Sequence, residues 1–147
     1  MLVPFGGGGL SCGIASAVRA LKPDARVFAC EVVTAAPLAP SLAAGSPQTV
    51  TYTSSFVDGI GSKSILAEMW PLASALLAGS LVSSLEEVVA AVRILAERNR
   101  VIAEGAGATS VAAALAGRAG EGNVVCVVSG GNLNSAVLAR ILQGEMP

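Results

Sequence analysis

The amino-acid sequence predicts an α/β fold, with an open and mainly parallel sheet flanked by helices. Short apolar runs rich in β-branched residues alternate with segments of helical periodicity, which is typical of parallel strands joined by helices. Two glycine turns, at Gly6–Gly9 and at Ser129–Asn132, each follow an apolar run and precede a helical segment. In an open parallel sheet, ligands gather at the carboxyl ends of the strands, where such turns lie. The sequence therefore predicts both a fold class and the edge of the sheet where a site belongs.

The length and composition predict a single domain over residues 1–147. Of its 147 residues, 53% are hydrophobic and 13% are charged, which is enough for one substantial core. No apolar stretch reaches the roughly 18 residues of a membrane span, and the first residues lack the basic region of a secretory signal. A net charge of −1 without a basic cluster disfavours nucleic acid as a partner.

The histidine and cysteine content narrows the chemistry. The chain has no histidine, which excludes imidazole-based catalysis such as a Ser-His-Asp triad. Cys12, Cys30 and Cys126 have no metal-like spacing and lie in apolar surroundings, where cysteine is most often a small core residue. Their odd number suits a reducing compartment, so we expect a cytoplasmic protein.

The first glycine run and the helix after it predict a phosphate-binding loop. Gly6, Gly7, Gly8 and Gly9 lack a Cβ atom, so their backbone can adopt positive φ and bring several N–H groups to one anion. The helix expected over Leu10–Leu21 directs its N-terminal dipole to the same point. Tight packing of a strand-to-helix turn is an alternative use of such a run. The Walker pattern is excluded because no Lys-Ser or Lys-Thr pair follows, and GxGxxG fits poorly because the run is uninterrupted.

The next elements are a strand, an irregular stretch and a helix. Val27–Cys30 is apolar and follows the turn-forming pair Pro23-Asp24, which predicts a second strand. Prolines and a glycine interrupt residues 35–55, which predicts a short helix followed by a long irregular segment. Pro71 is expected to begin a helix that runs to about Ala78, because proline is tolerated at the first helical position.

The second half of the chain predicts two more helices, a strand and a last helix. Ser84 and Glu87 form a capping box for a helix whose apolar positions keep the helical period. Ala103–Leu115 is expected to be a helical region whose small residues let backbones approach closely. The uninterrupted apolar run Val124–Val128 predicts a buried strand, and the last helix is expected to end at about Gln143.

Four motifs in this order resemble one known family. GGGGL at residues 6–10, DGI at 58–60, EGAGA at 104–108 and SGGN at 129–132 are together similar to the threonine/serine dehydratase and serine racemase family of fold type II pyridoxal-phosphate enzymes. The resemblance covers essentially the whole chain. It implies part of the large domain of those enzymes and, as cofactor, non-covalently held pyridoxal 5'-phosphate.

The resemblance also implies a set of cofactor-binding residues. Gly6–Gly9 and Leu10 would hold the cofactor phosphate, Ser129 would face the pyridine nitrogen, and Glu104 would lie near the cofactor ring. A neutral hydroxyl can donate a hydrogen bond to that nitrogen but cannot keep it protonated as a carboxylate would, which suits elimination or racemisation of hydroxyamino acids. By local pattern alone, SGGN is equally a capped turn, Glu104 a carboxylate favoured by a helix dipole, and Asp58-Gly59 an ordinary turn.

No residue of this chain is assigned a catalytic role. In complete members of the family an upstream segment supplies the lysine that binds the cofactor covalently, and neither Lys22 nor Lys63 matches its position. We therefore expect a truncated dehydratase-like lyase that is inactive alone. Completed by a lysine-bearing partner, it would convert hydroxyamino acids to an oxoacid and ammonia.

No metal site is expected either. The resemblance implies that Glu31 matches a metal-binding carboxylate of the family, followed by the carbonyl of Ala35. Pro37 stands where those proteins carry a second acidic side chain. One carboxylate and one carbonyl make a poor site for a divalent cation.

Two functions from different classes stay open. The chain is either a half-enzyme that works with a separate N-terminal half, or a non-catalytic module that self-associates or binds a phosphate ligand. An incomplete parallel sheet leaves a strand edge and apolar faces uncovered, and such surfaces tend to pair. We therefore expect a homo-oligomer, most simply a dimer.

Overall fold

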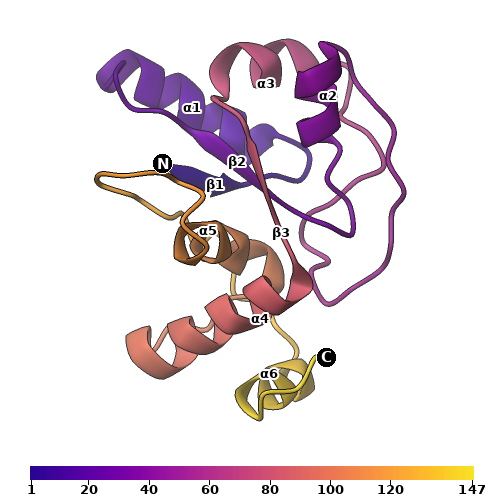
Figure 1. The fold of residues 1–147 in the computed structure, drawn as a ribbon, viewed down its shortest axis with the longest axis vertical. Helices are drawn as coiled ribbons and strands as arrows, with labels where there is room; N and C mark the ends of the chain where they lie inside the picture. The colour runs from indigo at the N-terminus through magenta and orange to yellow at the C-terminus, as the bar shows by residue number, and fades with distance from the viewer.

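The computed structural model describes residues 1–147 and contains one three-stranded sheet (Figure 1). Its strands, β1 (Leu2–Pro4), β2 (Phe28–Val32) and β3 (Ser80–Ser83), lie in the order β1-β2-β3. Both pairs are parallel, with Val3 opposite Ala29 and Cys30 opposite Leu81. The predicted open, mainly parallel α/β sheet is therefore confirmed, and its carboxyl ends share one edge.

Helices cover both faces of the sheet (Figure 1). α1, α2 and α3 lie on one face, α5 and α4 lie on the other, and α6 packs against α4. A π-helical turn, Leu95–Asn99, continues α4. The helices are α1 (Gly9–Leu21), α2 (Leu38–Ala44), α3 (Trp70–Leu76), α4 (Leu85–Ile94), α5 (Gly105–Leu115) and α6 (Ser135–Leu142). Measured against the length and hydropathy of a bilayer span, every helix of the structure falls short.

The sheet separates two apolar clusters. One contains Val3 and Ala29 of the sheet together with buried residues of α1 and α3. The other joins α4, α5 and α6, with Val88, Ala112 and Ile141 fully or almost fully buried in it. Strand β2 contributes to both clusters, through Ala29 to the first and through Val32 to the second.

Local sequence signals place several helix boundaries. Ser84 and Glu87 form the predicted capping box at the start of α4: Glu87 N–H donates to Ser84 Oγ (3.3 Å), and Ser84 N–H donates to Glu87 Oε2 (2.9 Å). Pro71 lies in the first turn of α3, as expected, although that helix ends at Leu76 and not at Ala78. The short helix and long irregular stretch expected after the second strand correspond to α2 and the segment from Gly45 to α3.

The expectation of a buried strand at Val124–Val128 is wrong. The segment forms one isolated parallel bridge, between Leu2 and Cys126, with Leu2 N–H donating to the Val125 oxygen (2.8 Å). Val125 is 53% exposed and Val124 is 40% exposed. A continuous apolar run becomes a buried strand only where neighbours cover both of its faces. Here β1 lies along one edge, while the valine side chains at the start of the segment stay open to solvent.

Candidate functional site

A cavity of about 180 Å³ lies at the carboxyl end of β1, between the glycine run, α5 and the SGGN turn. All seven residues proposed from the sequence as cofactor-binding line it, although they come from segments more than a hundred residues apart in the chain. They are Gly6, Gly7, Gly8, Gly9, Leu10, Glu104 and Ser129. Because Gly59 and Ile60 line it as well, the fold brings together all four motifs of the sequence at one point.

The glycine run turns directly into α1. Gly8 is the residue before the helix and has φ +91°, a left-handed conformation that glycine adopts without a steric penalty. The first helical hydrogen bond runs from Cys12 N–H to the Gly8 oxygen (2.9 Å). The N–H groups of Gly9, Leu10 and Ser11 precede that bond, so they have no acceptor within the helix, and no side chain caps this end. The start of α1 therefore presents backbone donors and a positive dipole end to the cavity.

Two of the glycines have open space where a side chain would be. A Cβ atom at Gly7 or Gly9 would meet no protein atom within 4 Å, although both residues line the cavity. At Gly6, by contrast, a Cβ would lie 3.4 Å from the Ile60 Cα. The space over Gly7 and Gly9 is the room that an anion needs to reach the N–H groups. The donor set, N–H groups with no cationic side chain, is that of helix N-terminal phosphate sites, so the residues present fit a phosphate group.

Glu104 and the SGGN turn form the other side of the cavity. Glu104 is the residue before α5, and its N–H donates to the Gly130 oxygen (3.0 Å). Its carboxylate accepts from Asn132 N–H (3.2 Å). Ser129 directly precedes Gly130 in this turn; it lines the cavity and is exposed to solvent. The turn is therefore attached to the start of α5 at two points.

Sequence reasoning missed part of the lining. Gly59 and Ile60 also line the cavity, as do Pro4, Ser11 and Ala106. The DGI motif at 58–60 was the signal for the first two, since it was one of the four motifs of the resemblance, but it predicted no role for them. No sequence signal pointed to Ser11. Its hydroxyl donates to the Pro4 oxygen (2.7 Å), which links the start of α1 to the end of β1 across the glycine run.

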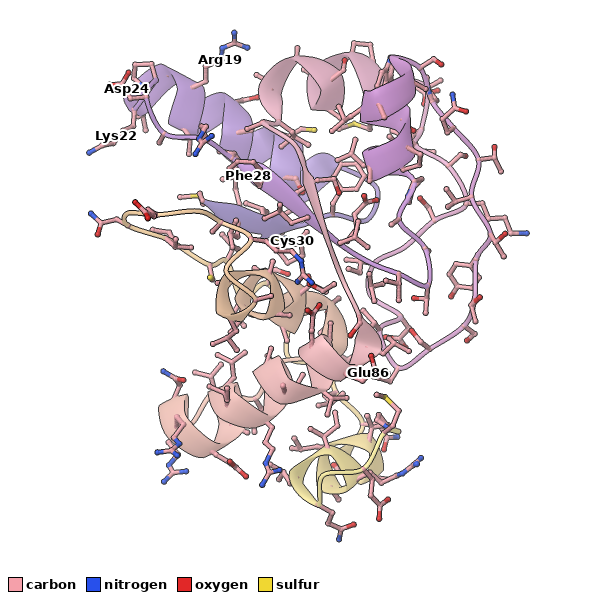
Figure 2. The ribbon with its side chains drawn as sticks, in the orientation of Figure 1. Arg19, Lys22, Asp24, Phe28, Cys30 and Glu86 are labelled. Carbon is pink, nitrogen blue, oxygen red and sulfur yellow. The ribbon has the colours of Figure 1, made fainter.

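The two lysines lie away from the cavity. Lys22 caps the C-terminal end of α1 and points away from the sheet beside Asp24 (Figure 2). Lys63 is exposed in the segment before α3, where its carbonyl oxygen accepts from Val50 N–H (2.8 Å). Neither lysine is among the residues that line the site.

Glu31 is fully buried and has a structural use. Its carboxylate accepts from the N–H groups of Leu38 (2.9 Å) and Ala39 (3.0 Å) and from Ser80 Oγ (2.6 Å). It thus caps α2 from β2 and links that helix to β3. Burial raises the pKa of the Glu31 carboxyl, while these three hydrogen bonds lower it. Both oxygens are occupied by protein donors, so this carboxylate is in use within the fold.

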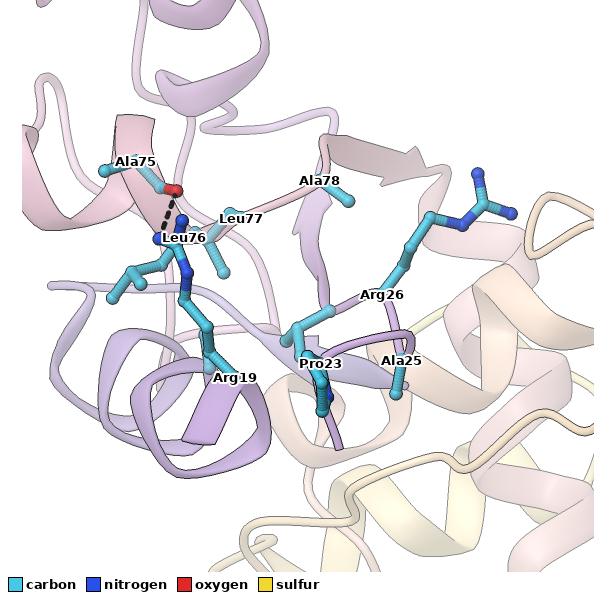
Figure 3. Close-up of a pocket in the computed structure, with 10 residues that line it drawn as sticks. Arg19, Pro23, Ala25, Arg26, Ala75, Leu76, Leu77 and Ala78 are labelled. Atoms are coloured by element: carbon cyan, nitrogen blue, oxygen red, sulfur yellow. Dashed lines mark hydrogen bonds between the residues drawn. The ribbon is translucent and has the colours of Figure 1, made fainter. Parts of the chain in front are cut away.

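A second cavity, of about 260 Å³, lies between the ends of α1 and α3 (Figure 3). Two arginines line it, and each has a partner within the protein. Arg19 donates to the Ala75 oxygen (3.2 Å), and the guanidinium of Arg26 lies over the Phe28 ring, 5.3 Å from its centre. The two cations do not converge on one point, so this cavity lacks the arrangement of an anion site.

Comparison with known proteins shows the family to which the chain is similar. A family model described as "Pyridoxal-phosphate dependent enzyme" matches residues 1–130. The L-threonine ammonia-lyase of Geobacter sulfurreducens is 35% identical over 145 residues, which are 97% of this chain and 36% of that protein. The catabolic L-threonine dehydratase of Escherichia coli K12 is 30% identical and is matched over 44% of its length.

Solved structures show the same relationship. A bacterial threonine deaminase superposes with a TM-score of 0.85 at 32% identity, over 90% of this chain and 49% of that one. Maize serine racemase gives a TM-score of 0.85 at 30% identity, over 97% of this chain and 47% of that one. The chain thus spans about a third to a half of the length of these proteins.

Proposed function

The chain belongs to the family of pyridoxal-phosphate-dependent enzymes, and from that premise we propose that residues 1–147 form the phosphate-binding part of a threonine/serine dehydratase-like protein. One observation carries the proposal: the Gly6–Gly9 loop begins α1 with three N–H groups that have no helical acceptor, and it lines a cavity in which the Cβ positions of Gly7 and Gly9 are free of protein atoms. A dianionic phosphate suits that end of a helix because both the donors and the dipole favour negative charge.

Each side of the cavity has a separate task in this proposal. The N–H groups of Gly9, Leu10 and Ser11 hold the cofactor phosphate, and Gly7 leaves room for it. Ser129, which also lines the cavity, would donate a hydrogen bond from its hydroxyl to the pyridine nitrogen. Pyridoxal phosphate supplies an electron sink for negative charge at the substrate Cα, and the reaction proposed is elimination from L-threonine or L-serine to an oxoacid and ammonia.

The proposal assigns the reacting amine to residues outside these 147. Lys22 and Lys63 are the lysines of the chain, and neither lines the cavity. A covalent step at the cofactor needs an amine within bonding reach. The 147 residues alone are therefore proposed to bind the cofactor without turning over a hydroxyamino acid, with residues 1–147 folding as one domain.

A second function is favoured by the exposed apolar surface. Leu21, at the end of α1, is 84% exposed and Val125 is 53% exposed, and both line an apolar groove of about 520 Å³. Water-exposed apolar area of this kind marks an association surface. The chain is therefore proposed to be a homodimer, with a separate lysine-bearing chain as the alternative occupant.

The experiment that tests the phosphate site is equilibrium binding of pyridoxal 5'-phosphate to the purified chain, followed by ligand fluorescence. Pyridoxal serves as the ligand without a phosphate. Saturable binding that is lost with pyridoxal, and that inorganic phosphate displaces, supports the proposal. Equal binding of the two aldehydes would assign them to surface amines and remove the phosphate site.

Two glycine variants sharpen that experiment. Gly7→Val adds a side chain at a residue that lines the cavity and whose Cβ position is free of protein atoms, so it is expected to weaken binding at least about tenfold, the loss of about one hydrogen bond to a charged group. Gly13→Ala is the matched control: it lies on the exposed side of α1, also has open space around its Cα, and does not line the cavity. Its binding is expected to equal that of the unmodified chain.

A further inference from the structure

The carboxylate of Glu104 sits in a niche made by two glycines. A Cβ atom at Gly130 would overlap Glu104 Oε1 and lie 2.8 Å from its Cδ, and a Cβ at Gly59 would lie 2.8 Å from Oε1. Neither glycine has a positive φ, so the backbone at these positions would accept any L-residue. At Gly130 the three protein atoms nearest to the Cβ position all belong to the Glu104 carboxylate.

The same carboxylate holds the turn that carries Ser129. Asn132 N–H donates to Glu104 Oε2 at 3.2 Å, and the Glu104 main chain holds the turn separately through its N–H to the Gly130 oxygen. The main-chain bond survives any side chain at position 104. The side-chain bond is lost when the carboxylate is removed, and it is the bond that restrains Asn132, the last residue of the turn.

We infer that Glu104 is a positioning residue: its carboxylate, seated between Gly59 and Gly130, fixes the Ser129–Asn132 turn and with it the direction of the Ser129 hydroxyl. This inference rests on the proposed function, because the hydroxyl matters only when a pyridine ring lies against it. Glu104 acts through the turn and not by contact with the phosphate, which binds at the opposite side of the cavity. Gly130 is required for this arrangement, because a side chain at that position would occupy the space of the carboxylate.

The pairing of Glu104 with Gly130 can be tested by a double-mutant cycle. Glu104→Ala removes the carboxylate, and Gly130→Ala evicts it by occupying the niche. Each variant is expected to speed hydrogen exchange of the Asn132 amide by about tenfold or more, the effect of losing one hydrogen bond to a charged acceptor. Because both changes break the same contact, the double variant is expected to exchange no faster than either single one. Multiplied effects in the double variant would overturn the inference.

A conservative variant separates positioning from simple loss of structure. Glu104→Gln keeps an acceptor oxygen of the same reach, so the Asn132 amide is expected to stay protected and pyridoxal phosphate binding to stay within about twofold. Glu104→Ala is expected to weaken pyridoxal phosphate about tenfold without lowering the affinity for inorganic phosphate, because the helix donors are untouched. An equal loss for both ligands would mean that Glu104 supports the glycine loop itself and would overturn the inference.

The two readouts keep this inference distinct from the proposed function. Amide exchange is measured on the chain without ligand, so it reports on the Glu104 contact even if pyridoxal phosphate does not bind. Failure of pyridoxal phosphate to bind the unmodified chain would remove the proposed function. Unchanged exchange at Asn132 in Glu104→Ala would remove the inference, whatever the ligand does.

Discussion

Glu31 shows how a buried charged residue is satisfied within one chain. Its two oxygens accept hydrogen bonds from two N–H groups at the start of α2 and from Ser80 on β3. Each of these donors would lose its partner if the carboxylate were removed, and unpaired buried donors are costly. The residue thus stabilises the junction of β2, α2 and β3.

We predict that Glu31→Gln lowers the free energy of unfolding by about 1–3 kcal/mol. The glutamine NH₂ group would replace one carboxylate oxygen and would face a donor that has lost its acceptor. Urea unfolding followed by circular dichroism measures this change. Glu68→Gln is the control, since Glu68 is exposed, and it is expected to unfold within about 0.5 kcal/mol of the unmodified chain. Equal midpoints for both variants would contradict the capping role of Glu31.

At the scale of the elements, Glu87 ties the start of α4 to the loop after α5. It completes the capping box with Ser84 and also receives both N–H arms of Arg118, at 3.0 and 2.6 Å. The Arg118 guanidinium holds the pKa of the Glu87 carboxyl below its usual range. Because the folded-state pKa is lowered, the stability gained from this pair is present above the unfolded value of 4.5 and is lost as the pH falls through the folded pKa.

We predict that Glu87→Gln costs about 0.5–1 kcal/mol at pH 7, since glutamine keeps the capping hydrogen bond but loses the partly exposed ion pair. The difference between the two proteins is expected to shrink as the pH falls below 4.5 and the carboxyl of the unmodified chain takes up a proton. Thermal unfolding over a pH series measures it. A difference that is independent of pH would show that the ion pair with Arg118 contributes nothing.

Close packing of α5 on the SGGN turn gives a further prediction. A Cβ at Gly107 would lie 2.8 Å from the Gly130 oxygen and 2.9 Å from its nitrogen, which are backbone atoms with little freedom to move. Gly107→Ala is therefore expected to destabilise the fold by about 1–3 kcal/mol.

The control for this prediction is Gly13→Ala, a helical glycine with open space around it, which is expected to stabilise by about 0.5–1 kcal/mol. Calorimetric unfolding of both variants gives the comparison. A stabilised Gly107→Ala variant would show that the small residue serves no packing purpose.

The elements that sequence reasoning found and missed differ in where their determinants lie. The capping box of α4 and the proline of α3 are local chemistry, so both helices were predicted. β3 was not predicted, because only Leu81 and Val82 of its four residues are apolar and its pairing comes from β2. Val124–Val128 was wrongly predicted to be a buried strand. Its apolar run is a local signal, whereas burial depends on neighbours that such a run does not specify.

The sequence motifs identified many of the residues that line the cavity. Glycine at positions 6–9 and the acidic residue of EGAGA are motif residues, and all of them line the cavity. The niche for the Glu104 carboxylate could not be predicted, because it requires Gly59 and Gly130 to meet one side chain from a third segment. Such a contact exists only once the sheet has placed the three segments together.

At the scale of the whole molecule, the apolar surface is unevenly distributed. Most large apolar side chains enter the two clusters on either side of the sheet. Leu21 and Val125, however, border one groove of about 520 Å³ at the edge of the sheet where β1 meets the segment 124–128. With a net charge of only −1, the chain has little electrostatic repulsion to oppose pairing of two such surfaces.

We predict that the purified chain sediments as a dimer at about 50 µM and that Leu21→Lys shifts it toward the monomer, because a lysine ammonium at the centre of an apolar contact must be desolvated. The variant is expected to fold normally, since Leu21 is 84% exposed and a cation suits the C-terminal end of a helix. Leu66→Lys is the matched control: Leu66 is 59% exposed but lies in the segment before α3, so this variant is expected to remain dimeric. A monomeric unmodified chain would refute self-association. A dimer that persists in Leu21→Lys would place the contact elsewhere on the molecule.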